Sequence, residues 1–141
     1  MGYLSIVQIC QILIGLFLGI CMFQSGTDKI LDWKGNYQWL QDHFSKTFLK
    51  SFVMPMLLIV LILEILSGVL CLIGSLFGLF NNDTSLILSG LILIGINLTA
   101  LFFGQRYAKD YEGAAVLVNY FLKMSFFLKG ISQITQLFLE L

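Results

Sequence analysis

Long apolar runs alternate with polar links along this chain, and four of the runs have the length of a membrane-crossing helix. A helix rises about 1.5 Å per residue, so about 20 residues cross a hydrocarbon core about 30 Å thick. Continuous runs favour helices over the alternating pattern of a membrane β-barrel. The pattern predicts an all-α fold, an integral membrane four-helix bundle that forms a single transmembrane domain over residues 1–141. The predicted spans cover about residues 3–24, 55–78, 84–104 and 114–139.

The link between the first and second runs is long for a connector, and its second half is amphipathic. In the segment of about residues 37–52, aromatic and leucine side chains recur at helical spacing, and lysine, glutamine and aspartate lie largely opposite them. Such a face suits the headgroup boundary, which would make the segment an interfacial helix. A cap over the helix bundle would use the same face, and the sequence leaves both uses open.

Composition narrows the classes of function. Hydrophobic residues make up 58% of the chain and charged residues 11%, whereas about 25% of the residues in a soluble domain are charged. Eight basic and eight acidic residues cancel, which leaves no global field to attract nucleic acid. A water-soluble enzyme and a nucleic-acid-binding protein are therefore disfavoured, and membrane lipid is the expected surrounding.

The positive charges predict an orientation. With four spans, the first and third links lie on one side of the membrane, and they carry all the lysine and arginine found outside the fourth run. The N-terminal tail, the turn at residues 79–83 and the C-terminal tail carry none. Because cytoplasmic loops are enriched in these residues, we expect the first and third loops in the cytoplasm and both termini outside.

Glu64, near the middle of the second span, is the most informative residue of the chain. A charge at that depth costs at least about 2.5 kcal/mol. At helical spacing Glu64 shares a small, polar face with Gly68 and Cys71, so this face is expected to point into the bundle. The functional interpretation is a proton relay or an anchor for a polar ligand head. The structural alternative is a hydrogen bond or ion pair between helices.

Polar residues in the other spans are candidate partners of Glu64. Asn119 and Lys123 lie four residues apart on one face of the fourth span. A pair of Lys123 with Glu64 would offset both burial costs, although Lys123 could instead extend to a lipid headgroup. Asn97 in the third span is expected to hydrogen-bond between helices. The predicted intramembrane polar site consists of Glu64, Cys71, Asn97, Asn119 and Lys123.

Small residues predict close helix packing. Gly15 and Gly19 form a GxxxG pattern in the first span, and Gly26 falls near the same face. Such patterns let two helix backbones approach each other closely. Gly68 completes the set of predicted packing glycines.

A second cluster of polar residues is expected where the first and third links meet the spans. Lys29 follows the first span, and Arg106, Lys109 and Asp110 follow the third. Such a cluster could hold an anionic group, or it could fix the depth of the helices through ion pairs. The sequence contains no paired metal motif, phosphate-binding glycine loop, catalytic triad or haem-attachment motif. It therefore predicts no metal and no catalytic residue, and it does not decide whether the chain is an enzyme.

Three stretches resemble the DoxX-like family of small four-helix integral membrane proteins. FQSGTDKILDW, at the end of the first span, resembles the F-x-x-G-x-x-K-L element of the family. Pro55, Glu64, Gly68 and Gly74 follow the P-x8-E-x3-G-x5-G pattern of its second helix. FGQRYAKDYEGAAVLVNYF is similar to the third-loop region of members of Bacteroidetes type. The resemblance covers nearly the whole chain, and Gly26, Lys29, Glu64 and Gly68 match its landmarks.

The resemblance implies a multi-pass protein of the bacterial inner (plasma) membrane. The family is named after a subunit linked to thiosulfate:quinone oxidoreduction, and other members are associated with sulfur metabolism, thiol homeostasis or oxidative stress, often through partner proteins. It therefore implies a subunit or accessory of a quinone- or sulfur/thiol-linked redox complex, with a protein partner or a homo-oligomer, and with a quinone as the candidate cofactor. A non-catalytic scaffold, assembly or lipid-binding protein is the alternative. A small proton-coupled transporter is a third, disfavoured because the sequence shows neither repeats nor broken helices.

Overall fold

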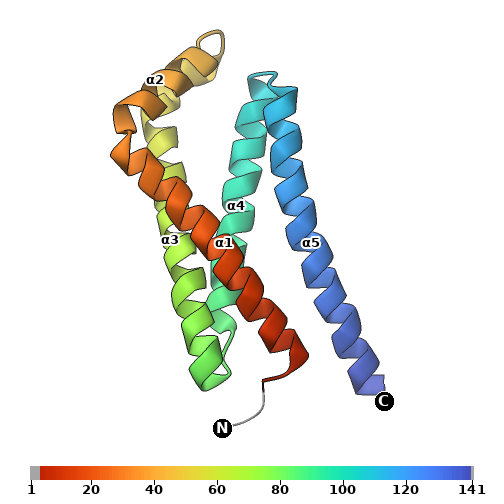
Figure 1. The fold of residues 1–141 in the computed structure, drawn as a ribbon. Helices are drawn as coiled ribbons and strands as arrows, with labels where there is room; N and C mark the ends of the chain where they lie inside the picture. Colours follow the sequence, from red (N-terminus) through yellow and green to blue (C-terminus); the bar gives the residue numbers. More distant parts are fainter. Residues whose placement is uncertain (1–3, 141) are drawn as a thin grey trace.

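The computed structural model of the protein describes the backbone of residues 4–140, and all the side chains in this range except those of residues 123, 126–128, 130–135 and 138. Every regular element in the described range is a helix, so the predicted all-α class is confirmed. The order is α1 (Ile6–Leu31), α2 (Trp33–His43), the 3-10 helix η1 (Phe48–Phe52), α3 (Val53–Asn81), α4 (Ser85–Tyr107) and α5 (Tyr111–Glu140) (Figure 1).

The four long helices run up and down, and α2 lies across one end of them (Figure 1). The start of α1 and the end of α5 lie at the other end, together with the turn between α3 and α4. Within the described residues, Ile6–Leu31, Phe48–Asn81 and Ser85–Tyr107 are long and apolar enough to cross a membrane. They support a membrane-embedded protein. The predicted fourth span falls on α5, and its crossing of the membrane stays a prediction.

Glycines line the seam between α1 and α3. A methyl group on Gly68 would lie 2.7 Å from the backbone nitrogen of Phe23, and one on Gly15 would lie 2.6 Å from the hydroxyl of Ser75. Gly19, one turn further along α1, faces Leu72 and Cys71 in the same way. The predicted packing glycines thus lie where two helix backbones approach each other too closely for a larger side chain.

The helices α3 and α4 pack closely near the turn that joins them and separate toward α2 (Figure 1). A methyl group on Gly74 would lie 2.7 Å from the backbone nitrogen of Ile87, and one on Gly90 would clash with Cys71. Further along α4, a methyl group on Gly95 would meet only the end of Met124 on α5, at 4.0 Å. The divergence of α3 and α4 toward α2 leaves room between these two helices.

The turn between α3 and α4 is held by side chains from both sides of it. The amide of Gln8 in α1 donates a hydrogen bond of 2.8 Å to the carbonyl of Asn82. Asp83 accepts a hydrogen bond of 2.9 Å from the backbone N–H of Ser85 at the start of α4. Hydrogen bonds from the backbone and then the side chain of Ser85 lower the pKa of Asp83 below its ordinary value. The turn therefore ties α1 to the start of α4.

The segment predicted as one amphipathic helix over residues 37–52 is divided in the structure, which corrects that prediction. The helix α2 ends at His43, a turn follows, and η1 begins at Phe48. The ring of Phe44 is buried and lies over Gly104, where a methyl group would be 3.4 Å from it. Anchoring this ring in the bundle bends the chain away from a continuous helix. Phe48 and Phe52 pack on each other and stay exposed.

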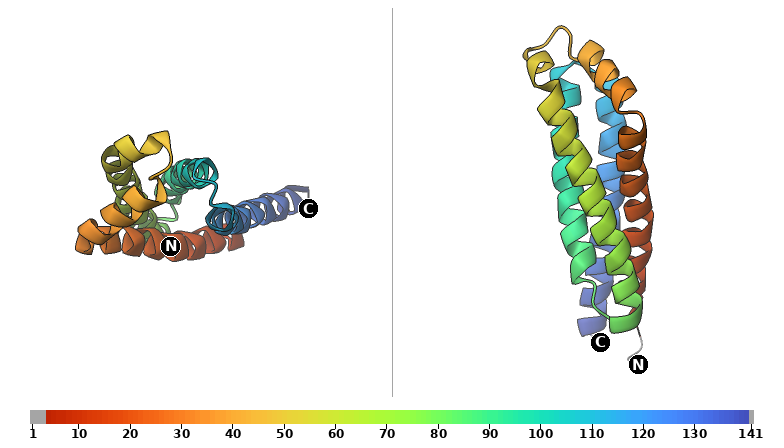
Figure 2. Two further views of the ribbon diagram at one scale, coloured as in Figure 1. Left: turned by 90° about the horizontal axis from the view of Figure 1, so that it is seen from above. Right: turned by 90° about the vertical axis from the view of Figure 1, so that its left-hand side faces the viewer.

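Figure 2 shows how α5 and α2 lie relative to the other helices. Seen from above, α5 extends away from the other three long helices, and seen from the side, α2 bridges the ends of α1 and α3. The helix α1 continues to Leu31, past the predicted end of the first span at residue 24. Its last two turns therefore carry side chains that the sequence analysis placed in a loop.

Candidate functional site

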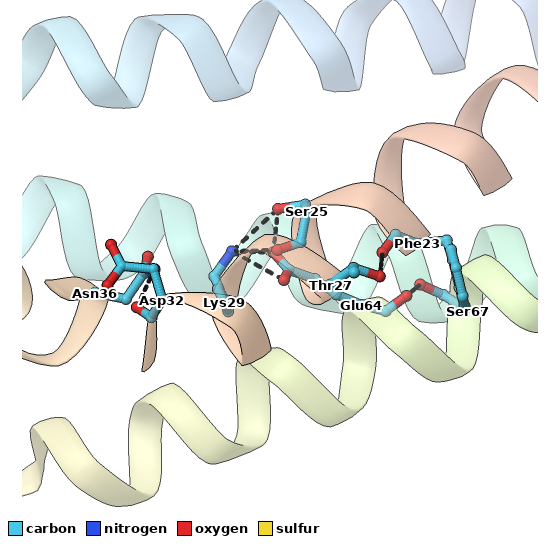
Figure 3. A network of polar contacts seen from close by, with 8 residues as sticks. All are labelled: Phe23, Ser25, Thr27, Lys29, Asp32, Asn36, Glu64 and Ser67. Carbon is cyan, nitrogen blue, oxygen red and sulfur yellow. Dashed lines mark hydrogen bonds and ion pairs between the residues drawn. The ribbon is translucent and has the colours of Figure 1, made fainter. Parts of the chain in front are cut away.

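A buried ion pair joins the end of α1 to the middle of α3 (Figure 3). The Lys29 ammonium lies 2.9 Å from Oε2 and 3.0 Å from Oε1 of Glu64. The Ser25 hydroxyl donates a hydrogen bond of 3.1 Å to Oε1 of Glu64 and accepts one of 3.0 Å from Lys29. Only 4% of the Glu64 side chain and 19% of the Lys29 side chain are exposed. Both charges are therefore matched where water is largely excluded.

The local sequence explains how these groups meet. Ser25 and Lys29 stand four residues apart in α1, so they share one face of the helix. Gly26 lies against α3, and a methyl group there would be 2.6 Å from the end of Ile65. The missing side chain at Gly26 lets α1 come close enough for Lys29 to reach Glu64. The contact needs the extension of α1 beyond residue 24.

Four oxygen atoms surround the Lys29 ammonium, one more than it has protons. They are both carboxylate oxygens of Glu64, the hydroxyl of Ser25 and, at 3.5 Å, the carbonyl of Ser25. Oε2 of Glu64 is buried and makes no hydrogen bond to the described residues, although it lies within ion-pair distance of Lys29. The pair is thus saturated on the ammonium side and retains accepting capacity on the carboxylate side.

Among the described side chains, the charged partner of Glu64 is Lys29. Asn119 is exposed on α5, so the structure does not bring it to Glu64. The predicted pairing with Lys123 concerns a side chain outside the described residues. The sequence did contain a sign that the first helix continues to Lys29, because Ser25 and Lys29 stand one helical turn apart. It was missed because the polar residues after residue 24 suggested a loop.

Asn97 is a second buried polar residue of the bundle. Its side chain is fully buried, and neither its Oδ1 nor its Nδ2 makes a hydrogen bond to the described residues. The antiparallel register that places Gly90 beside Cys71 puts Asn97 level with Glu64 along the bundle. Cys71 is itself fully buried, two turns from Glu64. Of the predicted polar site, the structure therefore places Glu64 and Asn97 at one depth and Cys71 apart from them.

The residues of the predicted loop cluster have separate contacts. Lys29 belongs to the buried pair, and Arg106 lies over the ring of Tyr111 at 4.8 Å. Lys109 is exposed and has a positive φ of 59°, in the turn between α4 and α5. Asp110 accepts a hydrogen bond of 2.9 Å from the backbone of Gly113 at the start of α5. These contacts order the link between the two helices.

A cavity of about 1080 Å³ lies between α3 and α4 at the end that α2 covers. Its walls are apolar, with Leu57 and Val60 on α3 and Ile92 and Ile96 on α4. Gly95 on α4 also lines the cavity, and its missing side chain adds further room. Most of its volume thus offers the surroundings of a hydrocarbon chain.

Polar groups gather at the α2 end of this cavity. Nε2 of His43 lies 2.7 Å from Oε1 of Gln105, and Oδ2 of Asp110 lies 3.8 Å from the same nitrogen. The ring of Trp39 stacks on His43, with 4.6 Å between the centroids. His43, Trp39, Gln105 and Lys29 all line the cavity. The contact between His43 and Gln105 was not predicted, because these residues stand 62 positions apart in the sequence.

The contact between His43 and Gln105 fastens α2 to α4, and a substitution tests it. Changing His43 to phenylalanine keeps a ring beside Trp39 and removes the hydrogen bond, at a cost of about 1 kcal/mol. We expect faster amide hydrogen exchange in α2 and unchanged exchange in the middle of α3. Lys46→Ala, at an exposed position of the following turn, is the control. Equal exchange in α2 of both variants would show that the contact does not hold the helix.

Among the described residues, His, Cys, Asp and Glu side chains form no group of three that could hold a metal ion. The candidate site consists of the Ser25–Lys29–Glu64 network and the cavity beside it that α2 covers. Comparison with protein-family models, with curated proteins and with solved structures found no match to this chain.

Proposed function

We propose that this chain is a four-helix membrane protein that binds a lipid-like amphiphile in the cavity beneath α2. In this proposal it serves as a subunit or accessory of a membrane redox complex, and a quinone is the first candidate ligand. The observation that carries the proposal is the cavity of about 1080 Å³, with apolar walls and polar groups at one end. Ligand pockets have volumes of about 300–1,000 Å³ and combine apolar walls with a few placed polar groups.

The chemistry of the two ends supports such a ligand. An isoprenoid or acyl tail would lie between α3 and α4, beside Ile92 and Ile96. A head with carbonyl or hydroxyl oxygens would lie near Gln105 and Asn36, whose amides can donate hydrogen bonds. The sequence contains no motif for a redox centre of its own, so electrons would come from a partner protein. The DoxX-like resemblance supports this redox setting.

A lipid-binding or scaffold protein without redox activity is the second candidate, because the same cavity would accept the chain of a phospholipid. Transport receives less support. Transporters place their sites at discontinuous helices, whereas α1, α3 and α4 are each continuous helices in the described backbone.

We propose the bacterial inner membrane as the location, with α2 on the cytoplasmic side and both termini outside. The positive-inside rule supports this orientation. The end of α1, the helix α2, the link from α2 to α3 and the link from α4 to α5 lie at the same end of the bundle (Figure 1). They carry Lys29, Lys34, Lys46, Lys50, Arg106 and Lys109. Labelling in intact cells with a membrane-impermeant thiol reagent tests this orientation. Lys46→Cys and Asp83→Cys are each introduced into a chain whose three native cysteines are replaced, and only Asp83→Cys should react.

Filling the cavity tests the proposed function. Gly95→Phe places a ring in the open space beside Gly95, and Gly95→Ala is the matched control. We expect native mass spectrometry and extraction of the purified protein to find one bound amphiphile per chain. Its occupancy should fall at least ten-fold in Gly95→Phe and persist in Gly95→Ala. Wild-type protein without a bound amphiphile, or equal occupancy in both variants, would contradict the proposal.

A further inference from the structure

We propose that the cavity selects amphiphiles with an uncharged headgroup, and that Glu64 sets this preference as the internal counterion of Lys29. The inference rests on the proposed function, because it names the class of ligand that the same cavity binds. It concerns the charge of the headgroup, not the identity of the tail.

Lys29 offers a ligand neither a net charge nor an N–H that lacks an acceptor. It is the only residue lining the cavity whose side chain is an ammonium or guanidinium group, among the residues that the structure describes. Its charge lies within 3.0 Å of both oxygens of Glu64, and its three protons have acceptors in Glu64 and Ser25. The basic group at the edge of the cavity is therefore already neutralised.

The other polar side chains of the lining are amides, a hydroxyl and two aromatic heterocycles. They belong to Asn36, Trp39, His43, Thr99 and Gln105. Trp39 donates only, and an amide NH₂ provides two donors. His43 faces Gln105 and, at 3.8 Å, the carboxylate of Asp110. These groups suit a head that exchanges hydrogen bonds, and they provide no counterion for a full negative charge.

Anionic and uncharged headgroups would affect the ion pair differently. An anionic head could gain a cation only if Lys29 released Glu64, which would leave a buried carboxylate without its counterion. Such an uncompensated charge is strongly unfavourable in a largely water-free site. An uncharged head with oxygen acceptors disturbs nothing in the network. The geometry thus favours alcohols, carbonyl compounds and esters over sulfates, phosphates and carboxylates.

Two probes that share one tail test the preference. Hexadecanol and hexadecyl sulfate carry the same sixteen-carbon chain, and radiolabelled forms report binding to the purified full chain in a neutral detergent at pH 8. We expect the wild-type protein to bind hexadecanol at least ten-fold more tightly than hexadecyl sulfate. In Glu64→Gln the uncompensated ammonium of Lys29 should reverse this order.

A second variant keeps the test decisive if Glu64→Gln does not fold. Thr99 is exposed and lines the cavity, so Thr99→Lys adds a cation without a counterion, and Thr99→Met matches its length without charge. We expect Thr99→Lys to bind hexadecyl sulfate at least ten-fold more tightly than Thr99→Met does.

The outcomes separate the two proposals. Wild-type protein that binds neither probe would overturn the proposed function. Binding of both probes with equal affinity would leave the proposed function standing and overturn the preference for uncharged heads. An unchanged preference in a folded Glu64→Gln would show that the pairing of Lys29 with Glu64 does not set the selectivity. Equal binding of hexadecyl sulfate to Thr99→Lys and Thr99→Met would show that an unpaired cation in the cavity does not attract an anionic head, and would overturn the preference as well.

Discussion

Replacing Lys29 by methionine is expected to lower the free energy of unfolding by about 3–5 kcal/mol, the usual cost of removing one member of a buried ion pair. The reason is the carboxylate left behind. Glu64 has 4% of its side chain exposed, and Lys29 is its only ion-pair partner among the described residues. Methionine matches the length of the lysine stem, so the change isolates the lost charge. Unfolding in mixed micelles with increasing sodium dodecyl sulfate measures it.

The control for this experiment is Lys34→Met. Lys34 is exposed and lies in the first turn of the neighbouring helix α2, so its replacement should change stability by no more than about 0.5 kcal/mol. Adding Glu64→Gln to Lys29→Met should restore part of the lost stability, because the two side chains are in contact and their effects are not additive. Equal stability of Lys29→Met and Lys34→Met would contradict the assignment of the pair.

Replacing Gly68 by alanine is the second change with a large expected effect, a loss of about 1–3 kcal/mol from overpacking. The new methyl group would lie 2.7 Å from the backbone nitrogen of Phe23. A backbone atom cannot move aside as the end of a side chain can, so α1 and α3 would have to separate. That separation would also lengthen the contact between Lys29 and Glu64. Thermal unfolding of the purified protein measures the loss.

Gly95→Ala is the matched control, because its methyl group would meet only the end of Met124 at 4.0 Å. Alanine favours a helix over glycine by up to about 1 kcal/mol, so this variant should be as stable as the wild type or slightly more so. If Gly68→Ala and Gly95→Ala had the same stability, the close approach of α1 and α3 at Gly68 would not be a constraint on the fold.

The helical class and the packing faces were predictable from the sequence because they depend on local periodicity. Continuous apolar runs specify helices, and small residues one turn apart specify a face that can approach another backbone. The burial of Glu64 followed from the same reasoning, since it shares its helix face with Gly68. These features need only the residues of one helix.

The partner of Glu64 and the polar end of the cavity were not predictable in this way. Lys29 and Glu64 stand 35 residues apart, and His43 and Gln105 stand 62 apart. Each pair depends on how helices are placed by contacts elsewhere. Local polarity after residue 24 suggested a loop, whereas the ion pair offsets the cost of carrying Lys29 in a helix beside the bundle. The cavity arises from the divergence of α3 and α4, which no single segment encodes.

The glycines between α1 and α3 also restrict how copies of this chain could associate. Gly15 and Gly19 face α3 within one chain, so the GxxxG surface is already occupied and cannot join two protomers. The outward face of α1 presents large side chains, among them Leu13 and Phe17. A homo-oligomer built through that face would join bulky surfaces that lipid tails solvate equally well. The assembly of such an oligomer would then depend on bilayer thickness and lipid composition more than on the residues of the seam between α1 and α3.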